Sequence, residues 1–231
     1  MPQSEYDNLM LALANLEMLC LSGLQGLEER MSFTDNFGHP RGLLGRLMLV
    51  TMEKEHLPMA KWAFNLFEVP QTGTIVDLGC GGGYNVKRLL EKSQSAKVYG
   101  VDISDESVRK AKKINSKELG KRCEIMQGNV GQKPFKDGQF DFATAFETVF
   151  FWPNLPVNLL EVFRVIKAGG RFAVINNYGD PAIDWEKKVP CMKRYTVKEI
   201  QNFMEAAGFK IITQETKDNL FLVIGEKQKC C

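Results

Sequence analysis

The chain has 231 residues, of which 44% are hydrophobic and 25% are charged. These proportions are those of an ordinary globular protein, and they exclude disordered, collagen-like and low-complexity classes. Its 30 Lys and Arg against 28 Asp and Glu give a formal net charge of +2, too small a field to favour phosphate backbones or anionic lipid. We therefore expect no nucleic-acid partner.

The cysteines and the apolar segments exclude further classes. The six cysteines are scattered without a C-x-x-C pair or a nearby histidine, so we predict neither a metal site nor a disulfide framework. The most apolar stretch, residues 9–27, follows acidic residues and is interrupted by Asn15 and Glu17. It fits neither a signal peptide nor a membrane span. These absences favour a cytoplasmic protein with reduced thiols.

Residues 1–70 carry helical patterns. Apolar residues recur at three- and four-residue steps through 9–27, which predicts an amphipathic helix. A loop at 33–42 separates it from a second predicted helix at about 43–67, which Pro58 is expected to kink or divide. We interpret 1–70 as an N-terminal helical lid or cap segment and 71–231 as the main domain.

After Pro70, short β-branched runs alternate with polar helical patterns, which predicts an α/β fold with a parallel sheet. Helices are expected at 85–92, 104–119, 154–167 and 196–207, the last with a capping box formed by Thr196 and Glu199. The final two runs face each other across 216–219 as a hairpin, so the sheet would end in antiparallel strands. Seven strands are predicted, at 74–78, 97–101, 123–127, 140–146, 171–176, 210–215 and 221–225.

A glycine-rich turn follows the first predicted strand and precedes a helix. Gly79, Gly81 and Gly83 are spaced G-x-G-x-G, and Tyr84 stands where a dinucleotide fingerprint would have its third small residue. Asp77 would place a carboxylate at the strand's end, which would repel a pyrophosphate and suit a cationic group. The spacing therefore argues against a nicotinamide cofactor.

The second predicted strand ends in another carboxylate. Asp102 follows Gly83 by 19 residues and could bind both hydroxyls of a ribose. Taken singly, the glycines fit an ordinary tight turn and Asp102 fits a helix N-cap. Their combination on consecutive strand ends indicates a nucleoside site.

These motifs resemble those of the class I S-adenosylmethionine (SAM) dependent methyltransferases, within the broad family of small-molecule enzymes that includes ubiquinone and menaquinone C-methyltransferases. Residues 77–83 are similar to the family's first motif and 100–104 to its ribose-binding strand. Residues 127–130 match its third strand end, with Asn129 where the family usually has Asp, and 167–170 match the turn before its fifth strand. The resemblance extends from about Pro70 to the C-terminus.

The resemblance implies a Rossmann-like, seven-stranded, mostly parallel sheet with an antiparallel C-terminal hairpin, and SAM as cofactor with S-adenosylhomocysteine as product. It implies that Gly79 and Gly81 contact the methionine part, Asp102 the ribose, and Ile103 a face of the adenine. The full set of implied cofactor contacts is Asp77, Gly79, Cys80, Gly81, Asn85, Asp102, Ile103, Gly128, Asn129, Val130, Phe146 and Glu147.

Candidate catalytic groups follow the fourth and fifth strands, because ligands of open α/β sheets bind at the strands' carboxyl ends. Glu147 could act as a base or hold a cationic acceptor, or else cap a helix or bind the ammonium group of SAM. Tyr178 is a second candidate. His39 is the third, in a loop where the family commonly has its lid. His56 is expected to be a packed or surface residue.

We expect a methyltransferase that acts by in-line displacement on a small molecule. The fourth strand ends Phe146-Glu147-Thr148 and lacks the Asn/Asp-Pro-Pro-Tyr/Phe sequence, which argues against methylation of nucleobases or glutamine amides. Two alternatives stay open: a protein- or RNA-directed methyltransferase that docks through residues 1–70, and a SAM-binding regulatory protein without turnover.

Overall fold

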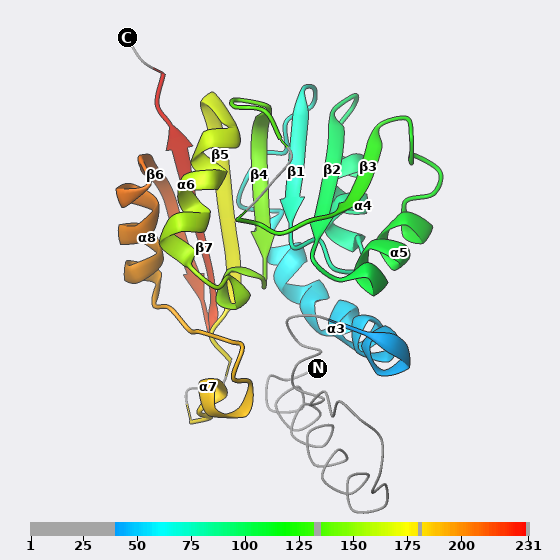
Figure 1. Ribbon diagram of the computed structural model, residues 1–231. Helices are drawn as coiled ribbons and strands as arrows, with labels where there is room; N and C mark the ends of the chain where they lie inside the picture. Colours follow the sequence, from blue (N-terminus) through cyan, green and yellow to red (C-terminus); the bar gives the residue numbers. More distant parts are fainter. Residues whose placement is uncertain (1–39, 132–134, 180–181, 230–231) are drawn as a thin grey trace, which may run out of the picture.

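The computed structural model describes residues 40–131, 135–179 and 182–229. The predicted helix at 9–27 and the candidate residue His39 lie outside these ranges. The described chain forms a central sheet with helices on both faces (Figure 1).

The sheet has seven strands in the order β3-β2-β1-β4-β5-β7-β6. Neighbouring strands from β3 to β5 pair in parallel, whereas β7 pairs antiparallel with both β5 and β6. The predicted sheet with its terminal antiparallel hairpin is therefore confirmed. The strands are β1 (Thr74–Leu78), β2 (Lys97–Asp102), β3 (Cys123–Gln127), β4 (Phe140–Phe146), β5 (Ile166–Asn177), β6 (Phe209–Lys217) and β7 (Leu220–Lys227).

Alternation of side chains along the strands supplies two apolar cores, one on each face of the sheet. In β1, Ile75 joins the core under the N-terminal helices, while Val76 joins the core on the opposite face. The first core is covered by α3 (Gly42–Ala63), α4 (Tyr84–Lys92) and α5 (Asp105–Ile114), and the second by α6 (Leu155–Val165) and α8 (Val197–Ala206).

Helix α3 differs from its prediction. It runs from Gly42 to Ala63 without interruption and contains Pro58, so the expectation that the proline divides the helix is wrong. Packing supplies the physical reason, since Met59, Ala60 and Ala63 directly after the proline are all buried. Their burial offsets the hydrogen bond that the proline cannot make.

Other boundaries differ less. The helix predicted at 104–119 ends at Ile114. Strand β5 begins at Ile166, earlier than predicted, because the chain already pairs with β4 at this residue; the glycine turn that follows forms a bulge in the pairing. The sequence analysis missed the short helix α7 (Trp185–Lys188) and the 3-10 turn η1 (Val149–Phe151). The predicted capping box of Thr196 and Glu199 is present at α8.

No helix within the described ranges is both long enough and apolar enough to span a bilayer.

Gly83 offers a test of this packing. It begins α4 with φ +80, and a Cβ there would lie 2.6 Å from the Cβ of Ala111 and 2.7 Å from its Cα. Gly120 has a similar φ of +75 with nothing within 4 Å of its Cβ position. In both alanine variants, the left-handed backbone conformation lowers the free energy of unfolding by about 1 kcal/mol. Gly83→Ala should lose about 1–3 kcal/mol more in urea unfolding, because only it overpacks α5. Equal losses would contradict this account.

Candidate cofactor and acceptor site

Three adjoining cavities lie at the carboxyl ends of β1, β2, β4 and β5. Their volumes are about 560, 300 and 110 Å³. The smallest shares Gly79 and Thr148 with the 300 Å³ cavity and His56 and Glu147 with the 560 Å³ cavity, and Phe151 lines all three. The cavities therefore adjoin one another in a row, called the tract below, with the smallest in the middle.

The glycine turn after β1 forms the floor of the middle cavity. Gly79 and Gly81 have φ of +75 and +50, which non-glycine residues rarely adopt. A Cβ at Gly79 would lie 2.1 Å from the Oγ1 of Thr148, whereas nothing lies within 4 Å of a Cβ position at Gly81. The first glycine is thus required by packing, and the second leaves its backbone open to a ligand.

Asp102 joins this turn to β2. Its Oδ2 accepts a hydrogen bond from the Gly81 backbone N–H at 2.8 Å, and its Oδ1 accepts one from the Ser104 N–H at 2.9 Å. Burial raises the pKa of Asp102, while these two hydrogen bonds act in the opposite direction. A carboxylate has about four acceptor positions, so both oxygens retain capacity for a pair of hydroxyl donors.

The 300 Å³ cavity continues past Asp102 toward β3. Ile103 is 44% exposed at its edge, an unusual position for a large apolar side chain. Gly128, Asn129 and Val130 form the opposite side, and the Oδ1 of Asn129 accepts a hydrogen bond from the Gly131 N–H at 2.8 Å. An apolar face beside backbone and amide groups suits a flat heterocycle such as adenine.

Glu147 ends β4 in a left-handed conformation with φ +55. Its backbone N–H donates to the carbonyl of Ile175 at 2.9 Å, and its carboxylate accepts a short hydrogen bond from the Asn177 N–H. Burial raises the pKa of Glu147 to about 8, so the carboxyl is mostly protonated at neutral pH. Residues with a strained backbone or a shifted pKa are concentrated at functional sites. Glu147 has both features and lies where two cavities meet.

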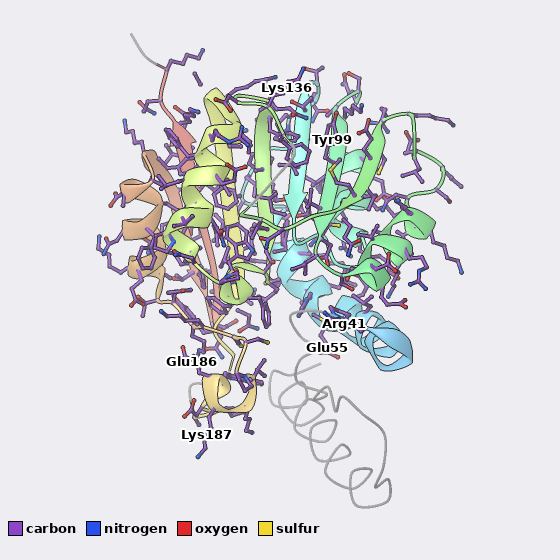
Figure 2. All side chains as sticks on the ribbon, viewed as in Figure 1. Arg41, Glu55, Tyr99, Lys136, Glu186 and Lys187 are labelled. Atoms are coloured by element: carbon purple, nitrogen blue, oxygen red, sulfur yellow. The ribbon has the colours of Figure 1, made fainter. Side chains whose placement is uncertain are left out.

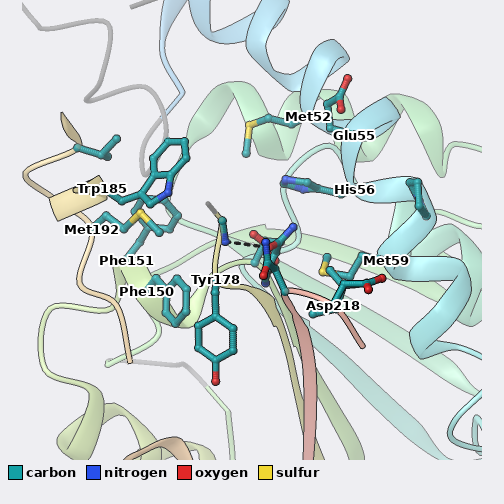
Figure 3. Close-up of a pocket in the computed structure, with 17 residues that line it drawn as sticks. Met52, Glu55, His56, Met59, Phe150, Phe151, Tyr178, Trp185, Met192 and Asp218 are labelled. Atoms are coloured by element: carbon teal, nitrogen blue, oxygen red, sulfur yellow. Dashed lines mark hydrogen bonds between the residues drawn. The ribbon is translucent and has the colours of Figure 1, made fainter. Parts of the chain in front are cut away.

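Helix α3 contributes the other wall of that junction. Met52 and His56, one turn apart, line both the middle and the largest cavity, and Figure 3 shows the His56 ring directed into the latter. His56, expected to be a packed or surface residue, is packed on α3 and also lines both cavities. Burial lowers its pKa to about 4, which leaves the imidazole neutral. An ion pair of 2.6 Å between Glu53 and Arg88 ties α3 to α4.

Aromatic and methionine side chains line much of the largest cavity, including Phe150, Phe151 and Trp185. The Tyr178 hydroxyl accepts a hydrogen bond from the Val197 N–H at 2.6 Å, and Figure 3 shows it pointing away from His56. The Tyr178 ring therefore forms part of the wall, and a catalytic role for its hydroxyl stays a prediction. Phe150 is 1% exposed and also belongs to the apolar core, so it is both wall and core.

Most of the sequence-predicted contacts come together in this tract. Asp77 is the exception, because it lines none of the three cavities and instead accepts a hydrogen bond from the Thr144 hydroxyl at 2.7 Å. Its burial raises its pKa to about 7. The residues that line the tract are Gly79, Cys80, Gly81, Asn85, Asp102, Ile103, Gly128, Asn129, Val130, Phe146 and Glu147.

The sequence analysis missed the contribution of α3. Met52, Glu55 and Met59 face the largest cavity at helical spacing, a signal that was present in the sequence. The wall supplied by Trp185, Val189 and Met192 had no comparable signal. Within the described ranges, no group of three His, Cys, Asp or Glu side chains is placed to hold a metal ion.

Comparison with known proteins identifies this arrangement. Residues 76–174 match the family model described as a methyltransferase domain. Residues 76–174 thus form a methyltransferase domain of the class I SAM-dependent type. The resemblance, the Rossmann-like fold and SAM as the cofactor are thereby confirmed.

Individual relatives agree with this assignment. The chain is 34% identical over 111 residues to 24-methylenesterol C-methyltransferase 2 of Arabidopsis thaliana, covering 48% of this chain and 30% of that protein. It is 38% identical over 103 residues to demethylmenaquinone methyltransferase of Lactococcus lactis, covering 44% and 41% respectively. The matches thus span less than half the length of these curated relatives. A SAM-dependent methyltransferase from Aquifex aeolicus shares the fold with a TM-score of 0.66 at 20% identity, covering 79% of this chain and 98% of its own.

The raised pKa of Glu147 makes stability depend on pH. Its folded value of about 8 exceeds the ordinary 4.5, so its favourable contribution is complete below about pH 4.5 and is lost as the pH rises through about 8. Glu147→Gln keeps the acceptor for the Asn177 N–H and cannot ionise. Urea unfolding at about pH 5 and about pH 9 should show the variant gaining stability relative to the natural chain at the higher pH. Glu205→Gln, on an exposed part of α8, is the matched control. A pH-independent difference for Glu147→Gln would contradict the assignment.

Proposed function

We propose that the chain transfers the methyl group of SAM to a small-molecule acceptor. The observation that carries the proposal is the row of adjoining cavities: one of about 300 Å³ beside Asp102, a small one beside the glycine turn, and one of about 560 Å³. Methyl transfer needs donor and acceptor to be held in line and shielded from water, and such positioning can supply about 7–11 kcal/mol of the barrier.

The residues present fit SAM. Asp102 would hold the ribose, Ile103 and Val130 the adenine, and the open backbone at Gly81 the methionine part. Bound SAM supplies a methyl group on a positively charged sulfur, with the leaving group already attached. Phe151 and Met52 would then exclude water from the junction, because both side chains border the donor and acceptor cavities.

Glu147 is proposed as the general base that takes a proton from the acceptor. Its position at the junction lets its carboxyl reach either cavity, and a pKa of about 8 suits a general base working near neutral pH. Tyr178 remains a proposed member of the acceptor site. His39 remains a proposed member of the lid formed by residues 1–70, of which α3 is the described part.

A pocket of this size favours a small molecule over a macromolecule, since small-molecule sites typically occupy about 300–1,000 Å³. The names of the sterol and demethylmenaquinone methyltransferases describe small acceptors of those relatives. Both observations support the same acceptor class here.

Asp102→Ala tests the cofactor site. Loss of hydrogen bonds to a charged group costs about 1.5–3 kcal/mol each, so isothermal titration should show S-adenosylhomocysteine binding weakened by about tenfold or more. Thermal unfolding of the same sample controls for folding. Tight NADH binding without binding of SAM or S-adenosylhomocysteine would reject the proposed function.

The acceptor class is tested with methyl-labelled SAM in a fractionated cell extract. The proposal expects label in the low-mass fraction, because the largest cavity is closed in by side chains from both α3 and α7. Glu147→Gln should reduce that transfer by about 100-fold or more, as loss of a general base does. Label confined to protein or RNA would instead support the macromolecular alternative.

A further inference from the structure

The acceptor cavity has an unbalanced set of charged groups. Three carboxyl side chains line it, those of Glu55, Glu147 and Asp218, and no Lys or Arg is among its described lining residues. Figure 2 shows Glu55 on α3 beyond the carboxyl ends of the central strands, while Lys136 lies at the opposite end of these strands. An anionic acceptor such as a carboxylate or a phosphate would therefore meet the carboxylates of Glu55 and Asp218, while Glu147, with a pKa of about 8, gains its charge only as the pH rises.

The three carboxyls also lack internal counter-charges. Two partly buried carboxylates elsewhere in the fold are paired, Glu53 with Arg88 at 2.6 Å and Asp141 with Lys167 at 2.8 Å, whereas Asp218 lies at the exposed rim of the cavity. Within the described ranges, no ion pair joins Glu55, Glu147 or Asp218 to a basic side chain. The cofactor does not account for this imbalance, since Glu55 and Asp218 line only the acceptor cavity.

The remaining walls suit a cation with an apolar body. Phe150, Phe151, Tyr178 and Trp185 present four aromatic rings, and Met52, Met59 and Met192 add polarizable sulfur. Aromatic faces attract ammonium groups, and the attraction is stronger where water is excluded. Methionines adapt to irregular apolar shapes. A neutral apolar acceptor would use these walls and leave the carboxyls without a partner.

We propose that the acceptor is an apolar amine, which enters the cavity as its ammonium cation and is methylated on nitrogen. This inference rests on the proposed function and names the substrate class of that same site. The geometry that supports it is the combination, around one cavity next to the donor site, of carboxyls without an ion pair, aromatic walls and no basic side chain among the lining residues that the structure describes.

Protons and electrons balance in such a reaction. The ammonium nitrogen passes one proton to the Glu147 carboxylate, which leaves a neutral amine with a lone pair. That pair forms the new N–C bond while the S–C bond breaks with its electrons remaining on sulfur, giving a methylated ammonium ion and neutral S-adenosylhomocysteine. The pKa of Glu147, about 8, is closer to the pKa of an amine, about 10, than the pKa of an ordinary carboxyl is. The proton transfer from the ammonium group to Glu147 is therefore less unfavourable.

Three probes with one carbon skeleton test the charge preference. The full chain, saturated with S-adenosylhomocysteine, is titrated with 3-phenylpropylamine, 3-phenylpropanol and 3-phenylpropanoate. We expect the amine to bind at least about tenfold more tightly than the alcohol and the carboxylate. Equal affinities, tighter binding of the alcohol or carboxylate, or no binding of the amine would each overturn the proposal.

A double variant assigns the preference to the cavity's carboxyls. Glu55→Gln with Asp218→Asn keeps the side-chain shapes, and Asn tolerates the φ of +53 at position 218. Amine affinity should fall about tenfold or more, while alcohol and S-adenosylhomocysteine affinities stay constant. Glu205→Gln should change none of them. Unchanged amine affinity in the double variant would count against the proposal.

The two proposals fail in different ways. If S-adenosylhomocysteine does not bind, the proposed function itself fails. If it binds normally and the amine shows no preference, only the acceptor class fails. A neutral apolar acceptor would then be the indicated alternative.

Discussion

The site depends on one constraint, the close approach of the glycine turn after β1 to the carboxylate that ends β2. The 2.8 Å hydrogen bond from the Gly81 N–H to Asp102 joins the ends of two neighbouring strands. The turn reaches this position through the left-handed backbone at Gly79 and Gly81, with φ of +75 and +50. Gly79, Gly81 and Asp102 all line the middle cavity, so this bond fixes the backbone on one side of it.

Much of the fold and of the cofactor side of the site could be predicted from the sequence, because local patterns fix both. Strand runs alternate with helical patterns, and parallel strands bring their carboxyl ends to one edge, where Gly79, Asp102 and Asn129 meet. Asp77 lines none of the three cavities for a geometric reason: side chains alternate along a strand, and this one lies beside Thr144, its partner on β4. Position in a motif does not determine which side of the sheet a side chain faces.

The acceptor side was less predictable because it is assembled from distant segments. His56 on α3, Glu147 after β4 and Trp185 on α7 surround one cavity, and no local pattern relates segments so far apart in the chain. The unbroken course of α3 through Pro58 has the same origin, since packing of the residues after the proline against the sheet decided it. Tertiary contacts, which local sequence patterns do not show, therefore determine both the acceptor cavity and the unbroken course of α3.

The ion pair between Glu53 and Arg88 has a consequence for how molecules enter and leave. Both side chains are only about one-fifth exposed, at 21% and 20%, and they fasten the helix that roofs the junction to the helix that follows the glycine turn. Arg88 is further oriented by Asn85, which lies in the same turn of α4. Any outward swing of α3 must first separate this pair, so dissolved ions that compete for it would speed exchange between the interior and bulk water. The strength of this ion pair, and with it the attachment of α3 to α4, therefore depends on the salt concentration of the surrounding solution.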